Sequence, residues 1–540
     1  MPLNGVEVLE TVLRDGLQSP EIKRMSADVL IRSGLEIARL VDSLGYVDII
    51  EAGFAGSSSE TDTIIREAAQ MGLNARIAAF GQVRAPHTHV EDYKANPRIK
   101  SMMDVNTPTV VLVYKSWEHQ VRSVLRTTPE ENLKMLEDTV RYLKEHGKEV
   151  IVDAEFASAA YLGKPQDGLK PNLEYLLGTM RIASLAGADR VVLCDTTGIL
   201  LPQHIHPLID HAANAVSSSS KVGFHGHEDH SIGSSLTYQA MLKGASHVQT
   251  SFVGTGERAG NASGIELLGL VTSPYQEHPV RMDLTNLKKT AEQVYKLLTG
   301  KELPKKTPFV GDLAYTHTGG MHADGGLKER SAYEGRTPED FGNKSRIHIS
   351  PQAGRGNIAA ILKLDKREPV VERIYQAAMV AMQEGYDLND GDLLQLIALR
   401  SQKDYVPPFK IVASDIGERS VGGSLEDSAS LTVNVRGEVY TKTYEGHAGL
   451  VDAAATDLVK IISQHYELPQ WRLLGWHSDA IDNEGTSQRV IAYATMEFKN
   501  GDSIKFKMPG ISRSATIASI QAITHGLEYA LLITNAQYRS

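Results

Sequence analysis

The sequence predicts a (β/α)8 barrel, that is a TIM barrel of the α/β class, followed by a mainly helical linker region and a C-terminal α+β domain. Three observations lead to this prediction. Short runs rich in Val and Ile alternate with longer segments of helical period over the first half of the chain. Near residue 280 the alternation stops, and helical segments joined by glycine-rich loops follow. After a Pro-Pro break at 407–408, strand-like alternation returns with further helical segments.

Eight apolar runs are expected to form the strands of the barrel. They lie at 6–12, 47–51, 75–79, 109–113, 149–154, 190–194, 221–224 and 247–251. Segments of helical period separate them, and the clearest lie at 26–44, 128–146, 172–186, 202–215 and 232–242. Eight strands alternating with helices within roughly 270 residues match a closed barrel better than an open, doubly wound sheet. We therefore place the barrel domain at 1–280.

The rest of the chain is expected to form two further parts. The linker region, 281–405, has helical segments at 284–298, 338–341, 357–364 and 370–384. The last domain, 410–540, has strand-like segments at 430–435, 437–444, 489–498 and 502–507 and helical patterns at 449–466 and 515–534. We find no low-complexity tract and no repeat of solenoid period.

Composition and charge narrow the class of protein. Apolar residues make up 41% and charged residues 23% of the 540 residues, which is ordinary for a globular protein. The formal net charge of −10 argues against a nucleic acid or an anionic membrane as a partner. The single cysteine, Cys194, excludes an internal disulfide and is typical of a reducing compartment. Because the chain starts without a signal-peptide pattern and has no uncharged apolar run of about 18 residues, we expect a cytoplasmic protein.

The stretch VGFHGHEDH, 222–230, places ligand-type side chains where the seventh strand should end. Side chains alternate between the two faces of an extended segment, so His225 and His227 project to the same side. Two imidazoles aimed at one point could bind one metal ion. A lone His-x-His is more often a pair of exposed polar residues, so the metal hypothesis depends on what the other strands bring.

The carboxyl ends of the other predicted strands also carry polar residues, and in a barrel these ends meet at one face. They are Arg14 and Asp15 after the first strand, Glu155 after the fifth, Thr196 after the sixth and Asn261 after the eighth. Asp15, two imidazoles and an amide oxygen make a mixed set of ligands suited to a divalent cation. The sequence therefore predicts a metal site formed by Asp15, His225, His227 and Asn261.

Each supporting residue also has a simpler explanation. Arg14 and Asp15 could form a plain ion pair at the rim, and Glu155 could be a solvated carboxylate there. Thr196 could only cap the next helix. The run GTGERAG at 254–260 is one residue too long for the spacing GxGxxG and does not follow an initial βαβ unit, so a dinucleotide site is disfavoured.

Together these motifs resemble the metal-dependent Claisen-type synthases, the family of isopropylmalate, homocitrate and citramalate synthases. The family's Arg-Asp-Gly-x-Gln motif stands at 14–18, its His-x-His motif at 225–227 and its Gly-Glu-Arg-x-Gly-Asn motif at 256–261. The linker motif appears as AYTHTGGMH at 314–322. The resemblance runs over nearly the whole chain.

Longer runs are most similar to the citramalate synthase branch of that family. They are KSWEHQV from 115, LRTTPEENLKMLEDTVRYLKEHGKEVIVDAE from 125 and SPQAGRGNI from 350. The last domain, with GHAGLVDAAATDL from 446 and GISRSATIASIQAI from 510, resembles the family's C-terminal regulatory domain.

The resemblance implies an acyltransferase that joins acetyl-CoA and pyruvate to give (R)-citramalate and CoA, as in isoleucine biosynthesis. It implies that the metal site holds Mn²⁺, Mg²⁺ or Zn²⁺, and that Arg14, Gln18 and Thr196 contact the 2-oxo acid. Arg14 would stabilise the forming alkoxide, while Glu155 and His322 would move protons. A simpler explanation of His322 is a histidine satisfied within a glycine-rich loop. A homodimer is also implied, in which the linker of one subunit reaches over the barrel of the other.

Several departures from the family pattern leave the acceptor open. Glu10 begins a Glu-Thr-Val run where Asp-Thr-Thr is usual, AGFAGS at 52–57 replaces Gly-Gly-Trp-Pro-Gly-Ser, Phe156 replaces a histidine, and Glu228 replaces an asparagine. The first alternative is the same chemistry on another 2-oxo acid, as in 2-isopropylmalate or homocitrate synthases. A hydroxyacyl-CoA lyase is a second, although the chain lacks a cysteine near the last strand. A third, a non-catalytic amino-acid sensor, would need a broken metal site.

Overall fold

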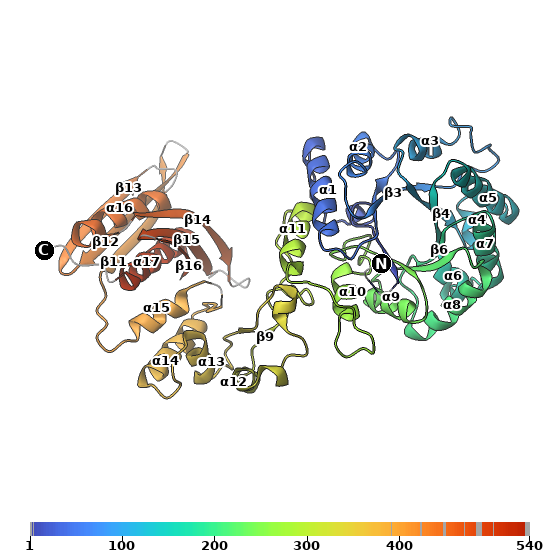
Figure 1. Cartoon of the computed structure of the whole chain (residues 1–540). Coiled ribbons are helices and arrows are strands. Elements are labelled where there is room, and N and C mark those ends of the chain that lie inside the picture. Colours follow the sequence, from blue (N-terminus) through green and yellow to red (C-terminus); the bar gives the residue numbers. More distant parts are fainter. Residues whose placement is uncertain are drawn as a thin grey trace. The chain divides into compact units, whose positions relative to one another are not determined.

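The computed structural model describes residues 3, 5–389, 391–421, 424–445, 450–468, 470–481, 489–500 and 502–534. The chain divides into two compact units, Met1–Tyr315 with Arg336–Ser345, and Thr316–Gly335 with Arg346–Ser540 (Figure 1). The domain boundaries predicted at 280 and 405 stay a prediction, because this division groups most of the linker helices with the last domain.

The first unit contains a closed barrel of eight parallel strands that follow one another in chain order. They are β1 (Glu7–Glu10), β2 (Ile49–Phe54), β3 (Arg76–Gln82), β4 (Thr109–Lys115), β5 (Glu149–Glu155), β6 (Arg190–Asp195), β7 (Lys221–Gly226) and β8 (His247–Thr250). The pairing of β1 with β8 sets Glu7 opposite His247 and Glu10 opposite Thr250. The predicted barrel is confirmed, and the strand ends differ from the prediction by only a few residues.

Helices surround the barrel, as Figure 1 shows. They are α1 (Ala27–Asp42), α2 (Ser59–Ala68), α3 (Pro97–Asp104), α4 (Glu118–Ser123), α5 (Pro129–Glu145), α6 (Ala157–Leu162), α7 (Leu173–Leu185), α8 (Pro202–Ala215), α9 (Gly233–Leu242), α10 (Gly264–Val271) and α11 (Leu287–Thr299). Local signals set their starts: α5 begins after Thr128, whose hydroxyl accepts a hydrogen bond from the Glu131 amide, and Pro129 occupies its first position.

The core of the barrel unit has two layers, because each strand is buried on both faces. One layer lies between the strands and the helices and includes Val110, Leu112, Val150 and Val152, all fully buried. The alternate residues fill the interior of the barrel: Leu9, Ile49, Ala78, Val111, Ile151 and Val192 form one buried cluster. The Val- and Ile-rich runs that predicted the strands are therefore runs that contact the core on both sides.

The second unit combines linker helices with two antiparallel sheets. It contains β9 (Thr316–His317), α12 (Gly320–Lys328), β10 (Arg346–Ile347), α13 (Arg355–Leu362), α14 (Pro369–Gln383), α15 (Leu393–Arg400), β11 (Lys410–Val421), β12 (Ser424–Val435), β13 (Glu438–Glu445), α16 (Leu450–His465), β14 (Gln470–Ala480), β15 (Val490–Asn500), β16 (Asp502–Ser512) and α17 (Ala515–Ile533). Sheets β11-β12-β13 and β14-β15-β16 are each followed by a helix, so three strands and a helix occur twice in succession. The linker helices and both sheets share one hydrophobic core.

Most of the elements expected beyond the barrel are present. The segment expected to be helical at 338–341 is a single 3-10 turn, Pro338–Phe341, and it belongs to the barrel unit. Strands β11 and β14 and helix α15 were not expected. Most residues of β14 are exposed, so its sequence carries little apolar signal. The first four residues of the run GHAGLVDAAATDL lie outside the described residues, and α16 begins at Leu450.

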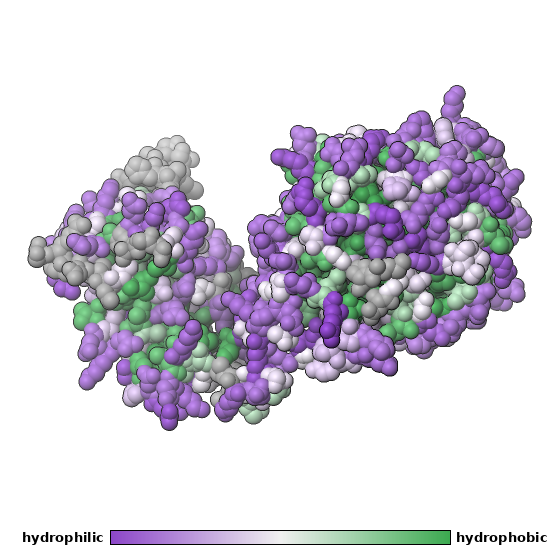
Figure 2. Space-filling model, viewed as in Figure 1, coloured by the Kyte–Doolittle hydropathy of each residue, from purple (hydrophilic) through white to green (hydrophobic). Residues whose placement is uncertain are grey.

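Hydrophilic residues dominate the face of the molecule that Figure 2 shows, with smaller apolar areas between them. Among the described residues, no helix is long and apolar enough to cross a membrane.

Strand β1 carries a buried carboxyl group that ties the strand to its neighbours. Glu10 Oε1 accepts hydrogen bonds from the backbone amides of Val12, at 2.9 Å, and Phe252, at 2.8 Å. Oε2 lies 3.0 Å from the Tyr46 hydroxyl and 3.2 Å from the Thr250 hydroxyl. Burial outweighs these hydrogen bonds and raises the pKa of Glu10 from 4.5 to about 8.

We expect this raised pKa to make the stability of the barrel depend on pH. Between about pH 4.5 and 8 the folded state keeps a proton on Glu10 that the unfolded state has released, so the free energy of unfolding falls as the pH rises. The slope should approach about 1.4 kcal/mol per pH unit within this window. Glu10→Gln should remove this part of the slope, and urea unfolding followed by circular dichroism between about pH 5 and 8 measures it.

Glu10→Leu is the contrasting variant, because it leaves the amides of Val12 and Phe252 without an acceptor. It should lower the free energy of unfolding by about 2–4 kcal/mol at every pH. Equal pH slopes for the wild type and Glu10→Gln would show that Glu10 does not hold the proton.

Candidate active site

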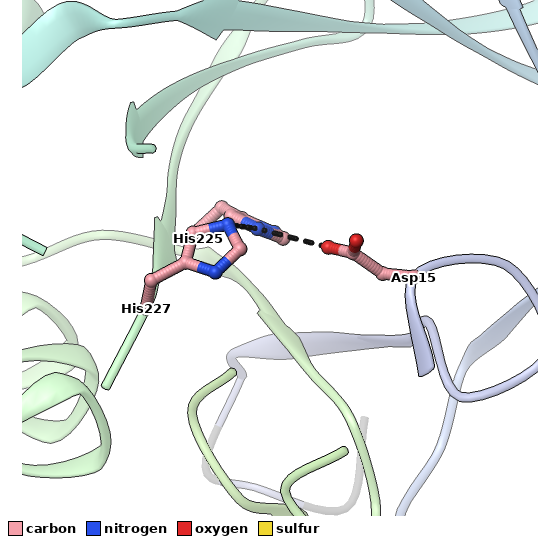
Figure 3. A group of neighbouring side chains, drawn as sticks. All are labelled: Asp15, His225 and His227. Atoms are coloured by element: carbon pink, nitrogen blue, oxygen red, sulfur yellow. Dashed lines mark hydrogen bonds and ion pairs between the residues drawn. The ribbon is translucent and has the colours of Figure 1, made fainter. Parts of the chain in front are cut away.

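Three of the side chains predicted to bind a metal lie together at the C-terminal end of the barrel. Asp15 follows β1 and precedes a short 3-10 turn, Gly16–Gln18, while His225 lies in β7 and His227 directly after it. All three are buried, and their ligand atoms lie within 4.8 Å of one another. Figure 3 shows the two imidazoles and the carboxylate converging. His225 Nε2 is 3.4 Å from Asp15 Oδ2 and 3.2 Å from His227 Nε2.

The second nitrogen of His225 is held by an amide. His225 Nδ1 lies 2.7 Å from Gln249 Oε1, and Gln249 Nε2 donates to Asp153 Oδ1 at 2.8 Å. Because the carboxylate occupies the amide nitrogen, the amide oxygen must accept from Nδ1–H of His225. The lone pair of His225 therefore lies on Nε2, directed at the cluster. Metal-binding histidines are commonly oriented in this way, through a hydrogen bond from the nitrogen that does not bind the metal.

The cluster contains atoms that the protein alone leaves unsatisfied. Within the described part of the chain, His227 Nδ1 is buried without a hydrogen-bond partner. If His227 Nε2 carries the proton and donates to His225, the lone pair on Nδ1 is orphaned. If His225 Nε2 carries the proton instead, which Asp15 favours by raising the pKa of His225, the N–H on His227 Nδ1 has no acceptor. With no proton between the rings, two lone pairs face each other at 3.2 Å. A cation between the two Nε2 atoms and Asp15 removes this conflict, and a carboxylate with two imidazoles suits a divalent ion. These residues therefore fit a metal.

Asn261 is oriented differently from the other predicted ligands. Its Nδ2 donates to Asp15 Oδ2 at 2.6 Å, so the amide nitrogen faces the cluster. Its Oδ1 is buried without a partner among the described residues and lies against Gly256, where a Cβ atom would approach it to 2.1 Å. A side chain at position 256 would therefore require the Asn261 amide to move. The assignment of Asn261 as a ligand remains a prediction that requires its amide to rotate.

Arg14 places a fixed positive charge beside the cluster. Its Nε donates to Glu51 Oε2 at 2.6 Å, its Nη1 lies 3.2 Å from Asp15 Oδ1, and its guanidinium stacks 4.2 Å above the Phe80 ring. Burial alone would raise the pKa of Asp15, but Arg14 and His225 lower it well below its usual range. Asp15 is therefore ionised, as a metal ligand must be.

Asp15 raises the pKa of His225 against the effect of burial, whereas the pKa shifts of Glu51, Asp153 and His227 follow burial. Burial raises the pKa of Glu51 to about 7, and it also raises the pKa of Asp153. Burial and the neighbouring His225 lower the pKa of His227 to about 3, so that its imidazole is neutral. A neutral imidazole is the form that binds a metal. Perturbed carboxyl and imidazole groups gathered in one pocket are typical of a functional site.

The cluster opens into a cavity of about 230 Å³. Seven predicted site residues line it: Arg14, Asp15, Gln18, Glu155, Thr196, His225 and His227. Its apolar wall is formed by Phe54, Phe80, Val113 and Cys194. The Thr196 hydroxyl accepts a hydrogen bond from the Phe156 amide at 2.8 Å, and Glu155 forms an ion pair with Lys115.

His322 belongs to the second unit. It is an exposed residue of α12, a helix rather than the glycine-rich loop expected from the sequence. Its ring lies 5.3 Å from that of Tyr333 and 6.3 Å from that of His317. The role of His322 in proton transfer stays a prediction.

Polar residues on or next to the site that were not predicted from the sequence include Glu51, Lys115, Asp153 and Gln249. All four lie in strands that were predicted, or directly after them. A polar residue inside a strand that is buried on both faces needs a hydrogen-bonding or charged partner. Polar residues within the apolar runs of the sequence could therefore have identified these positions.

The comparisons with known proteins agree with this architecture. Residues 5–294 match the HMGL-like family, 309–366 match the homocitrate synthase post-HMGL domain-like family, and 387–531 match the LeuA allosteric (dimerisation) domain. An (R)-citramalate synthase of Sulfolobus acidocaldarius is 33% identical and covers 98% of this chain and 97% of its own. An (R)-citramalate synthase of Aquifex aeolicus is 31% identical, covering 98% of both chains. A probable 2-isopropylmalate synthase of Archaeoglobus fulgidus is 27% identical, again covering 98% of both.

His227→Ala should lower the affinity for a divalent cation sharply, because it removes one of three buried ligands. The measurement is titration of the metal-free protein with Mn²⁺ by calorimetry, and an exposed histidine, His278, provides the control as His278→Ala. Unchanged Mn²⁺ binding by His227→Ala would mean that Asp15, His225 and His227 do not form the metal site.

Gln249→Ala should weaken Mn²⁺ binding by about 10–100-fold, although Gln249 does not belong to the ligand cluster, because His225 loses the group that selects its tautomer. Gln203→Ala, at an exposed position of α8, should leave Mn²⁺ affinity unchanged. Equal Mn²⁺ affinity of Gln249→Ala and the wild type would show that the amide does not orient His225.

Proposed function

This chain belongs to the HMGL-like family and to its citramalate synthase branch, and we propose that it transfers the acetyl group of acetyl-CoA to pyruvate, giving (R)-citramalate and CoA. The observation that carries this proposal is the similarity to (R)-citramalate synthases over 98% of the chain, linker and last domain included. The buried cluster of Asp15, His225 and His227 supports it, because a Claisen condensation on a 2-oxo acid needs a polarised keto group.

We propose that Asp15, His225 and His227, with Asn261 after rotation of its amide, hold Mn²⁺, Mg²⁺ or Zn²⁺. Such an ion, when bound, supplies a Lewis acid that orients a 2-oxo acid and polarises its keto group. Thr196 and Gln18, on the wall of the same cavity, are the proposed contacts for the acceptor.

Arg14 is proposed to stabilise the negative charge that develops on the keto oxygen. Its guanidinium is always charged, and Glu51 and the Phe80 ring hold it in place. A preorganised charge of this kind needs no rearrangement during the reaction, which is why it favours the transition state.

The methyl group of acetyl-CoA is a weak carbon acid, so the reaction also needs groups that move protons. Glu155 lies on the wall of the cavity, and His322 comes from the second unit. We propose that these two residues remove the methyl proton and return a proton to the alkoxide. Hydrolysis of the thioester then releases CoA and makes the overall reaction irreversible.

The walls of the cavity favour a small acceptor. Phe54, the phenylalanine of the AGFAGS run, lines the cavity and packs edge-on against Phe80 with 5.1 Å between ring centroids. Bulky apolar groups narrow this cavity of about 230 Å³, so the methyl group of pyruvate fits into it more easily than a branched side chain does. The departure from the family pattern at 52–57 therefore does not argue against pyruvate.

Further properties of the protein belong to the same proposal. The LeuA allosteric (dimerisation) domain supports a homodimer with linker exchange and an amino-acid effector bound by the last domain. A place in isoleucine biosynthesis follows from the proposed product. A cytoplasmic location without nucleic-acid or membrane partners fits the net charge of −10.

A second candidate keeps the chemistry and changes the acceptor. The relative in Archaeoglobus fulgidus that is a probable 2-isopropylmalate synthase favours 2-oxoisovalerate as the alternative.

We expect the Mn²⁺-loaded protein to release free thiol from acetyl-CoA when a 2-oxo acid is added. Its kcat/KM for pyruvate should be at least about tenfold higher than for 2-oxoisovalerate or 2-oxoglutarate. This ratio corresponds to about 1.4 kcal/mol in transition-state stabilisation. A thiol-reactive dye follows the reaction, and His227→Ala provides the inactive control. Preference for 2-oxoisovalerate would select the second candidate. Cleavage of citramalyl-CoA without any thiol release from acetyl-CoA would instead indicate a lyase.

A further inference from the structure

The barrel unit holds a second cavity, of about 330 Å³, next to the cavity of the metal cluster. Its walls come from the end of β3 and the loop that follows, the start of α3, the end of β4, and the segment leading into α5. Four residues line both cavities: Gln82, Val113, Lys115 and Glu155. The two cavities therefore adjoin at the ends of β3, β4 and β5, and the reaction as proposed above leaves the second cavity without an occupant.

The second cavity is preformed and largely apolar. Val83, Pro86, Ile99, Leu125 and Met135 supply apolar groups. The buried Arg84 guanidinium fixes its polar side, since it forms ion pairs with the partly exposed Glu131, at 2.7 Å, and Asp138, at 2.8 Å. Asn96 Oδ1 accepts from the Ala85 amide at 2.6 Å, which ties the loop after β3 to the start of α3. Such walls suit a slender, uncharged chain with a few amide groups.

Lys115 places an ammonium group where the cavities meet. It ends β4 opposite Glu155 of β5, and its Nζ forms an ion pair with the Glu155 carboxylate. Its backbone oxygen accepts from Asn132 Nδ2 at 2.9 Å, which fixes the end of the strand. An ammonium has three N–H donors, and the ion pair with Glu155 uses one of them. The others remain available to a group that lies across the junction.

Resting on the proposed function, we propose that the second cavity receives the pantetheine arm of acetyl-CoA and that Lys115 is a catalytic residue that donates a hydrogen bond to the thioester oxygen. The acetyl group of acetyl-CoA must reach the keto acid in the cavity of the metal cluster, while its long arm fills the second cavity. The thioester that joins them then lies where the two cavities meet. Lys115 and Glu155 are the charged residues that line both cavities.

The proposed role concerns the first chemical step. When a base removes a proton from the methyl group, the C–H electron pair forms a carbon–carbon double bond and the thioester carbonyl pair moves onto its oxygen. Lys115 stabilises that oxyanion through an N–H hydrogen bond and keeps its own proton. The enolate carbon then forms a bond to the keto carbon of the 2-oxo acid, whose carbonyl pair moves to its oxygen and takes up a proton. Water later cleaves the thioester and CoA leaves as the thiol.

The occupant of the second cavity is tested with Leu125→Trp, which fills it. Its matched control is Val124→Trp at the neighbouring position, which is 59% exposed and does not line the cavity. We expect Leu125→Trp to raise KM for acetyl-CoA at least about tenfold while calorimetric binding of pyruvate to the Mn²⁺-loaded protein stays unchanged. Equal KM values for both variants would overturn the assignment of the cavity.

The role of Lys115 is tested with Lys115→Met, with Lys100→Met on the exposed part of α3 as the control. We expect kcat to fall about 10²–10³-fold, as when one oxyanion donor is lost, with pyruvate binding retained. Lys115→Cys treated with 2-bromoethylamine rebuilds an ammonium at this position and should recover activity, whereas alkylation with iodoacetamide should not; the only native cysteine, Cys194, is buried.

The outcomes separate this proposal from the one on which it rests. A wild-type protein that releases no thiol with any 2-oxo acid would contradict the proposed function. An active wild type with Lys115→Met at full kcat, or recovery of Lys115→Cys by the uncharged reagent, would overturn only the role of Lys115.

Discussion

The pairing of β1 with β8 closes the barrel, and the site depends on that closure. Glu10 and Thr250 are opposite residues in the two strands, and the Thr11 amide donates to the Thr250 oxygen at 2.7 Å. Closure brings Asp15, which follows the first strand, next to His225 and to Asn261 after the eighth strand. The buried carboxyl of Glu10 reinforces this seam, because it binds amides on both of its sides. Glu10 of β1 thus supports the position of Asp15, which lies a few residues further along the chain.

The charges gathered behind this seam favour the binding of a cation. Asp15, Glu51 and Asp153 are all buried, and Arg14, whose side chain is 9% exposed, places a permanent positive charge beside them. Removing carboxylates from water is costly unless opposite charge compensates them. In the described structure this cost appears as the raised pKa values of Glu51 and Asp153, while Arg14 and His225 keep Asp15 ionised. A divalent cation beside Asp15 would compensate more of this negative charge than Arg14 does alone.

Much of this arrangement can be predicted from the sequence, because the barrel strands contact the core on both faces and so appear as continuous apolar runs. The alternation of strand and helix then predicts which strand ends meet, and with them the group of Asp15, His225 and His227. What could not be predicted depends on hydrogen bonds between distant residues. The turn of the Asn261 amide towards Asp15, and the link from Asp153 through Gln249 to His225, have no local pattern. Strand β14 was missed for the opposite reason, since its exposed residues carry no apolar period.

Two phenylalanines connect the shape of the acceptor cavity to its electrostatics. Phe80 is a wall of the cavity and also the surface on which the Arg14 guanidinium stacks, at 4.2 Å, and Phe54 packs edge-on against Phe80 while the Arg98 guanidinium lies 4.5 Å above its ring. Enlarging the cavity at either ring therefore also removes support from an arginine. Glu51 and Asp15 would still hold Arg14 through Nε and Nη1, but loss of the Phe80 ring would remove the surface on which the guanidinium stacks. The width of the cavity and the placement of Arg14 are thus coupled through the same side chains, so a change at either ring would alter both the cavity and the support of an arginine.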